Sequence, residues 1–168
     1  MNTDGRTSAA PSARQTNTPH LPVKRVMVPI DFSKTSVAAL RYAIPLTQQF
    51  GATLELVHVI EPTPFLSDMD NLPLAMSDAE VAQRVTAELA ALARREVPPG
   101  VPVEPVVRRG KPYQEITEAA KARNVDLIVI ATHGRTGLQH TLLGSTAERV
   151  VRLAPCPVLV VRGVENGA

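Results

Sequence analysis

The sequence predicts a single α/β domain, an open five-stranded parallel sheet with helices on both faces. Five short apolar runs alternate with segments of helical periodicity, and this alternation is typical of parallel strands joined by right-handed crossovers. Hydrophobic residues make up 44% of the chain and aromatic residues only 3%. The core must therefore consist of Val, Ile, Leu and Ala, which suits a buried parallel sheet. The 168 residues are enough for one such domain with a tail.

The five apolar runs predict the strands. Runs such as LIVIA and VLVV show little alternation between polar and apolar residues, as expected for strands that are covered on both faces. The third run alternates and contains prolines, which favours an edge position because proline cannot donate a hydrogen bond to a neighbouring strand. In chain order, the predicted strands span residues 25–31, 53–60, 101–107, 126–132 and 157–162.

The segments between these runs predict four helices. The first contains Pro45, which removes a backbone donor and should bend the helix. The second begins with a capping box of Ser77 and Glu80, and the fourth begins with the same pattern in Ser145 and Glu148. In chain order, the predicted helices span residues 36–50, 77–95, 112–123 and 145–153.

The ends and the composition of the chain suggest where the protein works. Residues 1–20 predict a disordered leader, because they are rich in Ser, Thr, Asn and Pro, and residues 21–165 form the predicted domain. No stretch of 18 apolar residues occurs, so we expect a cytoplasmic protein without a membrane partner.

The formal charge is only +2, which argues against a nucleic-acid partner. Cys156 is the single cysteine, and we expect an unreactive, buried thiol.

A glycine-rich segment follows the fourth predicted strand, where open parallel sheets bind ligands at the carboxyl ends of their strands. The segment continues into the last predicted helix, and the free N–H groups at the start of a helix suit phosphate. It therefore allows a phosphate site made of Gly134, Gly144, Ser145 and Thr146. In the alternative interpretation, Ser145 only caps the helix and the glycines only form turns.

Asp31 ends the first predicted strand at the same edge of the sheet. Its carboxylate could accept a hydrogen bond from a ribose hydroxyl or help to place a metal ion. It could instead cap the next helix, a role for which Ser33 competes, and the residues alone leave the two roles open. His58 lies inside the second predicted strand and indicates a packed core histidine. No cluster of His, Cys and carboxylates has metal-ligand spacing, so no catalytic or metal-binding residue is assigned.

Three separated segments resemble the universal stress protein family of the UspA type, in its ATP-binding subgroup. The spacing of Gly134, nine residues and then Gly144-Ser145 resembles the nucleotide-binding signature Gly-x-x-Gly-x9-Gly-Ser/Thr. VPIDFS at the first strand and LVHVI at the second are similar to the same family, and the resemblance covers residues 24–162. Ala131 stands at the first signature glycine, and Ile30 stands where a polar residue can occur.

The resemblance implies a Rossmann-like fold with sheet order 3-2-1-4-5 and a site for ATP, with Mg²⁺ held through the phosphates. It implies that Asp31 meets the ribose and phosphate side of the nucleotide and that Ala131 lies beside the base or sugar. It also implies that the protein forms a homodimer along the last strand. The residues expected to border the adenine are Pro29, Ile30, Val59 and Ile130, and those expected to hold the phosphates are Gly134, Gly144, Ser145 and Thr146.

Two functions follow from these expectations. The first is a stress-response regulator that binds ATP or another adenine nucleotide and changes its interaction with an unknown protein partner. No signature residue is an obvious base for activating water, so we expect at most slow ATP hydrolysis. The second is a dimeric adaptor of the same fold that works without a nucleotide.

Overall fold

The structure, a computed structural model, describes residues 22–62, 77–132 and 143–162. The predicted leader therefore lies outside the described residues. Strands and helices alternate along the described chain, as the apolar runs predict. In order, these elements are β1 (Arg25–Pro29), α1 (Lys34–Phe50), β2 (Thr53–Ile60), α2 (Asp78–Glu96), β3 (Val103–Arg109), α3 (Pro112–Ala122), β4 (Leu127–Ala131), α4 (Ser145–Leu153) and β5 (Val158–Val161).

The strands form one five-stranded sheet in the order β3-β2-β1-β4-β5, and each neighbouring pair is parallel. This arrangement confirms the predicted fold class and sheet order. It also confirms the edge position of the third strand, where the exposed Pro105 lies. The order of the strands reverses between β1 and β4, so a crevice is expected at the carboxyl ends of these two strands.

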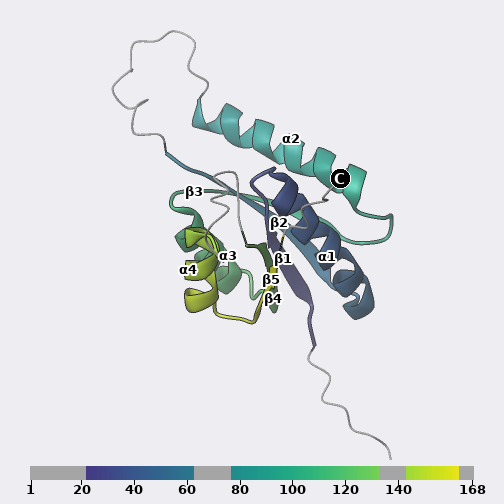
Figure 1. The fold of residues 1–168 in the computed structure, drawn as a ribbon. Helices are drawn as coiled ribbons and strands as arrows, with labels where there is room; N and C mark the ends of the chain where they lie inside the picture. Colours follow the sequence, from purple (N-terminus) through teal and green to yellow (C-terminus); the bar gives the residue numbers. More distant parts are fainter. Residues whose placement is uncertain (1–21, 63–76, 133–142, 163–168) are drawn as a thin grey trace, which may run out of the picture.

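The helices cover the two faces of the sheet in pairs, with α1 and α2 on one face and α3 and α4 on the other (Figure 1). Successive residues of a strand point to opposite faces. Leu56 therefore packs in the core on the α1–α2 face, whereas Val57 packs in the core on the α3–α4 face. Both side chains are almost completely buried, so β2 contributes to two cores at once.

The helix starts confirm one predicted capping box and correct the other. Ser77 caps α2, because its hydroxyl accepts a hydrogen bond from the Glu80 N–H at 3.3 Å while the Glu80 carboxylate accepts one from the Ser77 N–H at 2.7 Å. The capping box predicted at Ser145 is wrong. Gly144 is the N-cap of α4, with extended backbone angles of φ −69° and ψ 151°, and no side chain caps this helix. The N-cap lies one residue before the predicted one because the Gly144 carbonyl already accepts the Glu148 N–H at 2.9 Å, although α4 spans the predicted residues.

A buried glutamate ties three elements together on the α3–α4 face. Glu55 of β2 is 0% exposed, and its carboxylate lies 2.5 Å from Arg25 of β1 and 2.7 Å from Arg123 at the end of α3. Arg123 also forms an ion pair with Glu104 of β3. Because a buried carboxylate without such partners would be strongly destabilising, these pairs fix the amino-terminal end of the sheet against α3. No local sequence pattern predicts this network.

Candidate functional site

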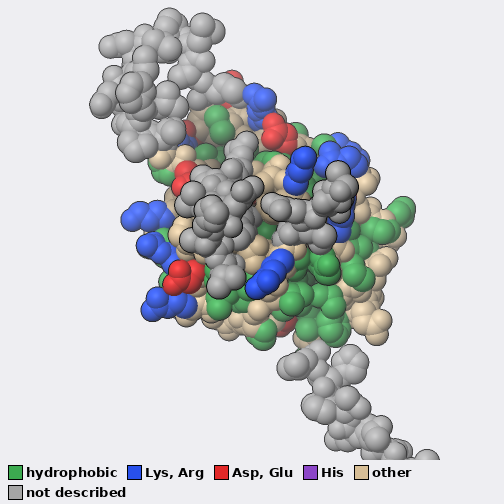
Figure 2. Space-filling model, in the orientation of Figure 1, with side chains coloured by type: hydrophobic (Ala, Val, Ile, Leu, Met, Phe, Trp, Pro, Cys, Tyr) green, Lys and Arg blue, Asp and Glu red, His purple; other side chains and the backbone are tan. Residues whose placement is uncertain are grey.

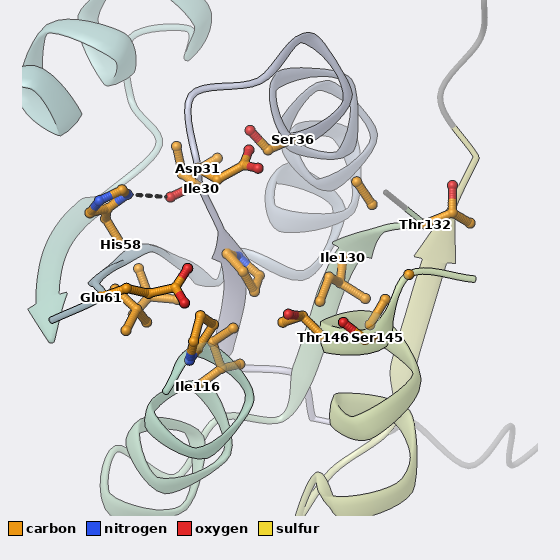
Figure 3. Close-up of a pocket in the computed structure, with 17 residues that line it drawn as sticks. Ile30, Asp31, Ser36, His58, Glu61, Ile116, Ile130, Thr132, Ser145 and Thr146 are labelled. Carbon is orange, nitrogen blue, oxygen red and sulfur yellow. Dashed lines mark hydrogen bonds between the residues drawn. The ribbon is translucent and has the colours of Figure 1, made fainter. Parts of the chain in front are cut away.

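A pocket opens at the carboxyl ends of β1 and β4, where the strand order reverses (Figure 3). It holds about 220 Å³, several times the ~30 Å³ that one water molecule occupies in the liquid, so it has room for more than bound water. Its lining residues come from β1, β2, β4 and the first turns of α1, α3 and α4. They are Pro29, Ile30, Asp31, Ser36, Val57, His58, Val59, Glu61, Pro112, Ile116, Ile130, Ala131, Thr132, Gly144, Ser145, Thr146 and Ala147.

The start of α4 presents unpaired backbone donors to this pocket. The Gly144 N–H donates to the Thr132 carbonyl at 2.7 Å, which anchors the helix start beside the end of β4. The next three N–H groups, those of Ser145, Thr146 and Ala147, have no hydrogen-bond partner among the described residues, as expected for the first turn of a helix. All three residues line the pocket. Three free donors at the positive end of a helix dipole can accept an anion such as phosphate.

The Ser145 hydroxyl is also available, because α4 uses no side chain as a cap. Figure 3 shows the Ser145 and Thr146 side chains directed toward the space beneath Ile130. Of the two roles open for Ser145, the structure therefore removes helix capping. A ligand oxygen at this helix start would meet backbone N–H groups and a hydroxyl together.

The loop after β1 holds Asp31 in place without making it a helix cap. Ser33 is the N-cap of α1, since its hydroxyl accepts the Ser36 N–H at 3.1 Å. The Asp31 carboxylate accepts hydrogen bonds from the Ser33 N–H at 3.0 Å and the Ser33 hydroxyl at 2.5 Å. Phe32 between them has a φ of 63°, a conformation that is unusual for a large side chain and that marks a constrained turn. Asp31 is thus oriented by the turn at the rim of the pocket.

His58 supports this turn from β2. Its Nδ1 lies 2.7 Å from the Ile30 carbonyl, and because a carbonyl only accepts, Nδ1 carries the proton. Its ring also packs against Phe32, with the ring centroids 5.0 Å apart. His58 therefore has a structural role, but it is half-buried and lines the pocket instead of lying in the core as predicted.

Apolar side chains form the wall of the pocket opposite Asp31. Ile130, Ile116 and Val57 are buried members of the core on the α3–α4 face, and Val59 packs against that core. Ile30 and Ala131 also line the pocket, but both belong to the core on the α1–α2 face. The apolar wall therefore comes mainly from the core on the α3–α4 face. A flat aromatic ring packed against this wall would be shielded from water.

The structure brings together every predicted site residue that it describes, and Gly134 lies outside the described residues. Pro112 and Ile116 of α3 also line the pocket, although no local sequence motif marks them. Ala147 was not predicted, although the rule that a helix leaves its first N–H groups unpaired would have found it. Glu61, directly after β2, is a further lining residue that was not predicted.

The pocket holds three side chains that can transfer protons, those of Asp31, His58 and Glu61. Within residues 22–62, 77–132 and 143–162, no three His, Cys, Asp or Glu side chains form a group that could hold a metal ion. In the same segments, no helix is long and apolar enough to cross a membrane. Away from the pocket, burial and then the nearby Asp126 raise the pKa of the half-buried Cys156 thiol, which disfavours its reactive thiolate form.

The fold and the pocket define a doubly wound α/β protein with an anion-accepting helix start at its strand-order reversal. Comparison with known proteins gives the family: residues 22–162 match the universal stress protein family, and the chain belongs to it. The universal stress protein MJ0531 of Methanocaldococcus jannaschii is 36% identical over 144 residues, which cover 83% of this chain and 82% of that protein. The solved protein MJ0577 is 27% identical with a TM-score of 0.71, over 84% of this chain and 96% of its own.

Two further solved structures share the fold and contain nucleotides. One is a universal stress protein in complex with cAMP, 21% identical with a TM-score of 0.62, covering 84% of this chain and 98% of its own. The other is the universal stress protein of Archaeoglobus fulgidus in complex with dAMP, 19% identical with a TM-score of 0.58, covering 83% and 98%.

The different roles of the two serines at helix starts lead to a prediction. Ser77→Ala removes a true N-cap and should lower the free energy of unfolding by about 1 kcal/mol. Ser145→Ala removes a hydroxyl that caps nothing and should change it by less than ~0.5 kcal/mol. Urea denaturation of both variants measures the difference. An equal loss in the two variants would show that Ser145 acts as a cap after all.

Proposed function

We propose that this protein binds ATP or a related adenine nucleotide in the pocket at the ends of β1 and β4, and that it acts as a nucleotide-dependent stress-response regulator. The observation that carries the proposal is the set of unpaired N–H groups at the start of α4, which lie in the same pocket as an apolar wall. A nucleotide combines the two matching features, a flat base and an anionic phosphate chain. The cAMP and dAMP complexes of other family members give this proposal further support.

The placement of the nucleotide in this proposal follows the chemistry of the lining. The adenine lies against Pro29, Val59 and Ile130, with the backbone of Ile30 and the methyl group of Ala131 at its border. The phosphates lie on the helix start that Gly144 anchors, where Ser145 and Thr146 donate hydrogen bonds. Asp31 accepts a hydrogen bond from the ribose. Gly134 is assigned to the phosphates from the signature spacing alone.

Mg²⁺ fits this arrangement as an ion held by the phosphates. A nucleotide-bound Mg²⁺ usually keeps several waters and takes only one or two protein ligands, so a cluster of protein carboxylates is not required. The ion would neutralise part of the phosphate charge near α4. The protein's own contribution is to bind and orient the nucleotide. We propose at most slow hydrolysis, because the Asp31 carboxylate is engaged by Ser33 and the His58 Nδ1 by Ile30.

We also propose that the protein forms a homodimer through β5. The two edges of the sheet differ: β3 carries Pro105 and two arginines, Arg108 and Arg109, which discourage pairing with another strand. The β5 edge consists of Val158–Val161 and carries neither proline nor charge. An apolar edge strand with free backbone groups favours a second copy of the same strand as its partner.

Apolar side chains beside β5 extend this edge into a surface. Leu159 of β5 is 40% exposed and Val151 of α4 is 44% exposed. Hydrophobic side chains also gather over the region of α1 (Figure 2), and Tyr42 and Phe50 are the large exposed ones of that helix. Because α1 and α4 both pack against β5, a partner chain paired with this strand would reach apolar surface on both sides of the sheet.

A series at Gly144 tests nucleotide binding. Millimolar ATP with Mg²⁺ should raise the melting temperature of the protein by several degrees, because a ligand that binds only the folded state stabilises it. Gly144→Ala should reduce this shift and Gly144→Val should abolish it, since each added carbon crowds the phosphate site. Differential scanning fluorimetry measures the shift. The backbone angles of Gly144 suit alanine and valine, so both variants should fold, with melting temperatures without ATP lowered only modestly by the poorer N-cap.

The alternative function has its own outcome in the same experiment. If ATP with Mg²⁺ leaves the wild-type melting temperature unchanged, the nucleotide-independent adaptor replaces the regulator. A full shift in Gly144→Val would instead show that the phosphates lie elsewhere.

A charge on β5 tests the dimer. Leu159→Arg places a cation on the apolar edge and should convert the dimer into a monomer, which light scattering after size-exclusion chromatography measures. Ala79→Arg is the matched control, because it adds the same charge at an exposed position of α2. This helix packs against β3 and β2, at the edge of the sheet opposite β5. A dimer that survives Leu159→Arg, or a wild-type protein that is already monomeric, would refute the β5 interface.

A further inference from the structure

Glu61 is a charged lining residue for which the proposed function leaves no role. It follows Ile60, the last residue of β2, at the mouth of the pocket. The end of β2 is fixed there, because the Ile60 carbonyl accepts the Gly110 N–H at 3.0 Å. Figure 3 shows the Glu61 carboxylate pointing into the pocket from the side opposite Ser145 and Thr146.

The Glu61 carboxylate has no hydrogen bond or ion pair with any of the described residues. The two carboxylates of the pocket differ in this respect, since Asp31 is held by Ser33. The arginines at the end of the neighbouring strand β3 are taken by other acids: Arg108 lies 2.9 Å from Glu115, and Arg109 is paired with Asp78. Glu61 thus presents its acceptor oxygens to whatever occupies the pocket.

The position of Glu61 assigns it to the base end of a bound nucleotide. Val59 lies two residues before Glu61 in the chain, and Figure 3 shows Ile116 beside Glu61, with Ser145 and Thr146 at the start of α4 across the pocket. A carboxylate repels phosphate, and a helix start attracts it, so both groups favour the same orientation of the ligand. The edge of the base is then the part of the nucleotide that reaches Glu61.

An ionised carboxylate can only accept hydrogen bonds, so it distinguishes bases by the donors on their edges. Adenine carries an exocyclic amino group at C6, which donates. Hypoxanthine and guanine carry a carbonyl oxygen at C6, and their donors on this edge are the N1–H and, in guanine, the amino group at C2. We propose that Glu61 lies opposite C6 of the base, where it accepts from a 6-amino group but faces the oxygen of a 6-oxopurine, and that it thereby selects 6-aminopurine over 6-oxopurine nucleotides. This inference rests on the proposed nucleotide function and adds the basis of base selection to it.

The selectivity should be moderate, because Glu61 is exposed and water competes for its carboxylate. A hydrogen bond to a charged group that is partly screened corresponds to a preference of roughly 5- to 10-fold. ATP should therefore bind roughly 5- to 10-fold more tightly than ITP, which differs from ATP at this edge of the base. GTP should share the weaker binding of ITP.

Isothermal titration calorimetry with ATP, ITP and GTP tests this assignment. In Glu61→Ala the acceptor is gone, and in Glu61→Gln the amide can rotate to offer either a donor or an acceptor. Both variants should lower the ratio of ATP to ITP affinity to about 1. The ratio is the decisive quantity, because removing a negative charge near an anionic ligand strengthens the binding of all three nucleotides alike.

Glu118→Gln provides the matched control. It removes the same charge from an exposed position on α3 that does not line the pocket, so the affinity ratio should stay at the wild-type value. If the wild type binds ATP and the ratio is unchanged in both Glu61 variants, or if it binds ITP or GTP as tightly as ATP, the role of Glu61 is refuted while nucleotide binding stands. If none of the three nucleotides binds to the wild type, the proposed function fails and the assignment fails with it.

Discussion

The hydrogen bond from the Gly144 N–H to the Thr132 carbonyl is the contact on which the site depends. It fastens the start of α4 to the chain that leaves β4, across eleven intervening residues in the sequence. Because Gly144 uses its own N–H in this bond, the unpaired donors of the helix begin with Ser145 and lie at the crevice between β1 and β4. Ala147 and Val150 pack α4 into the core on the α3–α4 face, and this hydrogen bond fixes where the helix begins relative to the end of β4. The apolar wall and the anion-accepting helix start therefore share one pocket.

The sheet order explains why one pocket can hold two unlike parts of a ligand. Neighbouring strands β1 and β4 send their crossovers to opposite faces, which leaves their carboxyl ends uncovered. The core on the α3–α4 face reaches this opening through Ile116 and Ile130 and supplies the apolar wall. On the other side, the turn of Asp31 to Ser33 is held by its own hydrogen bonds and by His58. The site is therefore organised by the scaffold before any ligand binds, which lowers the cost of binding in conformational entropy.

Local patterns in the sequence predicted the elements well, because local physics determines them. The uninterrupted apolar runs marked the buried strands, and the prolines of the third run placed it at an edge. The capping box at Ser77 was right, and the same pattern at Ser145 failed, because Gly144 is the N-cap and Ser145 is already the first residue of α4. Ile116, Glu61 and the ion pairs of Glu55 could not be predicted locally. Each joins the site or the core only through packing between elements that are distant in the sequence.

A crystal structure of the protein grown with saturating ATP and Mg²⁺ tests the central claim most directly. Phosphate oxygens should lie about 2.7–3.2 Å from the backbone nitrogens of Ser145, Thr146 and Ala147, with the base against Val59 and Ile130. The bond from Gly144 to Thr132 should persist in that structure. Phosphates bound away from the start of α4, or a pocket filled only by water at saturating ATP, would contradict the account.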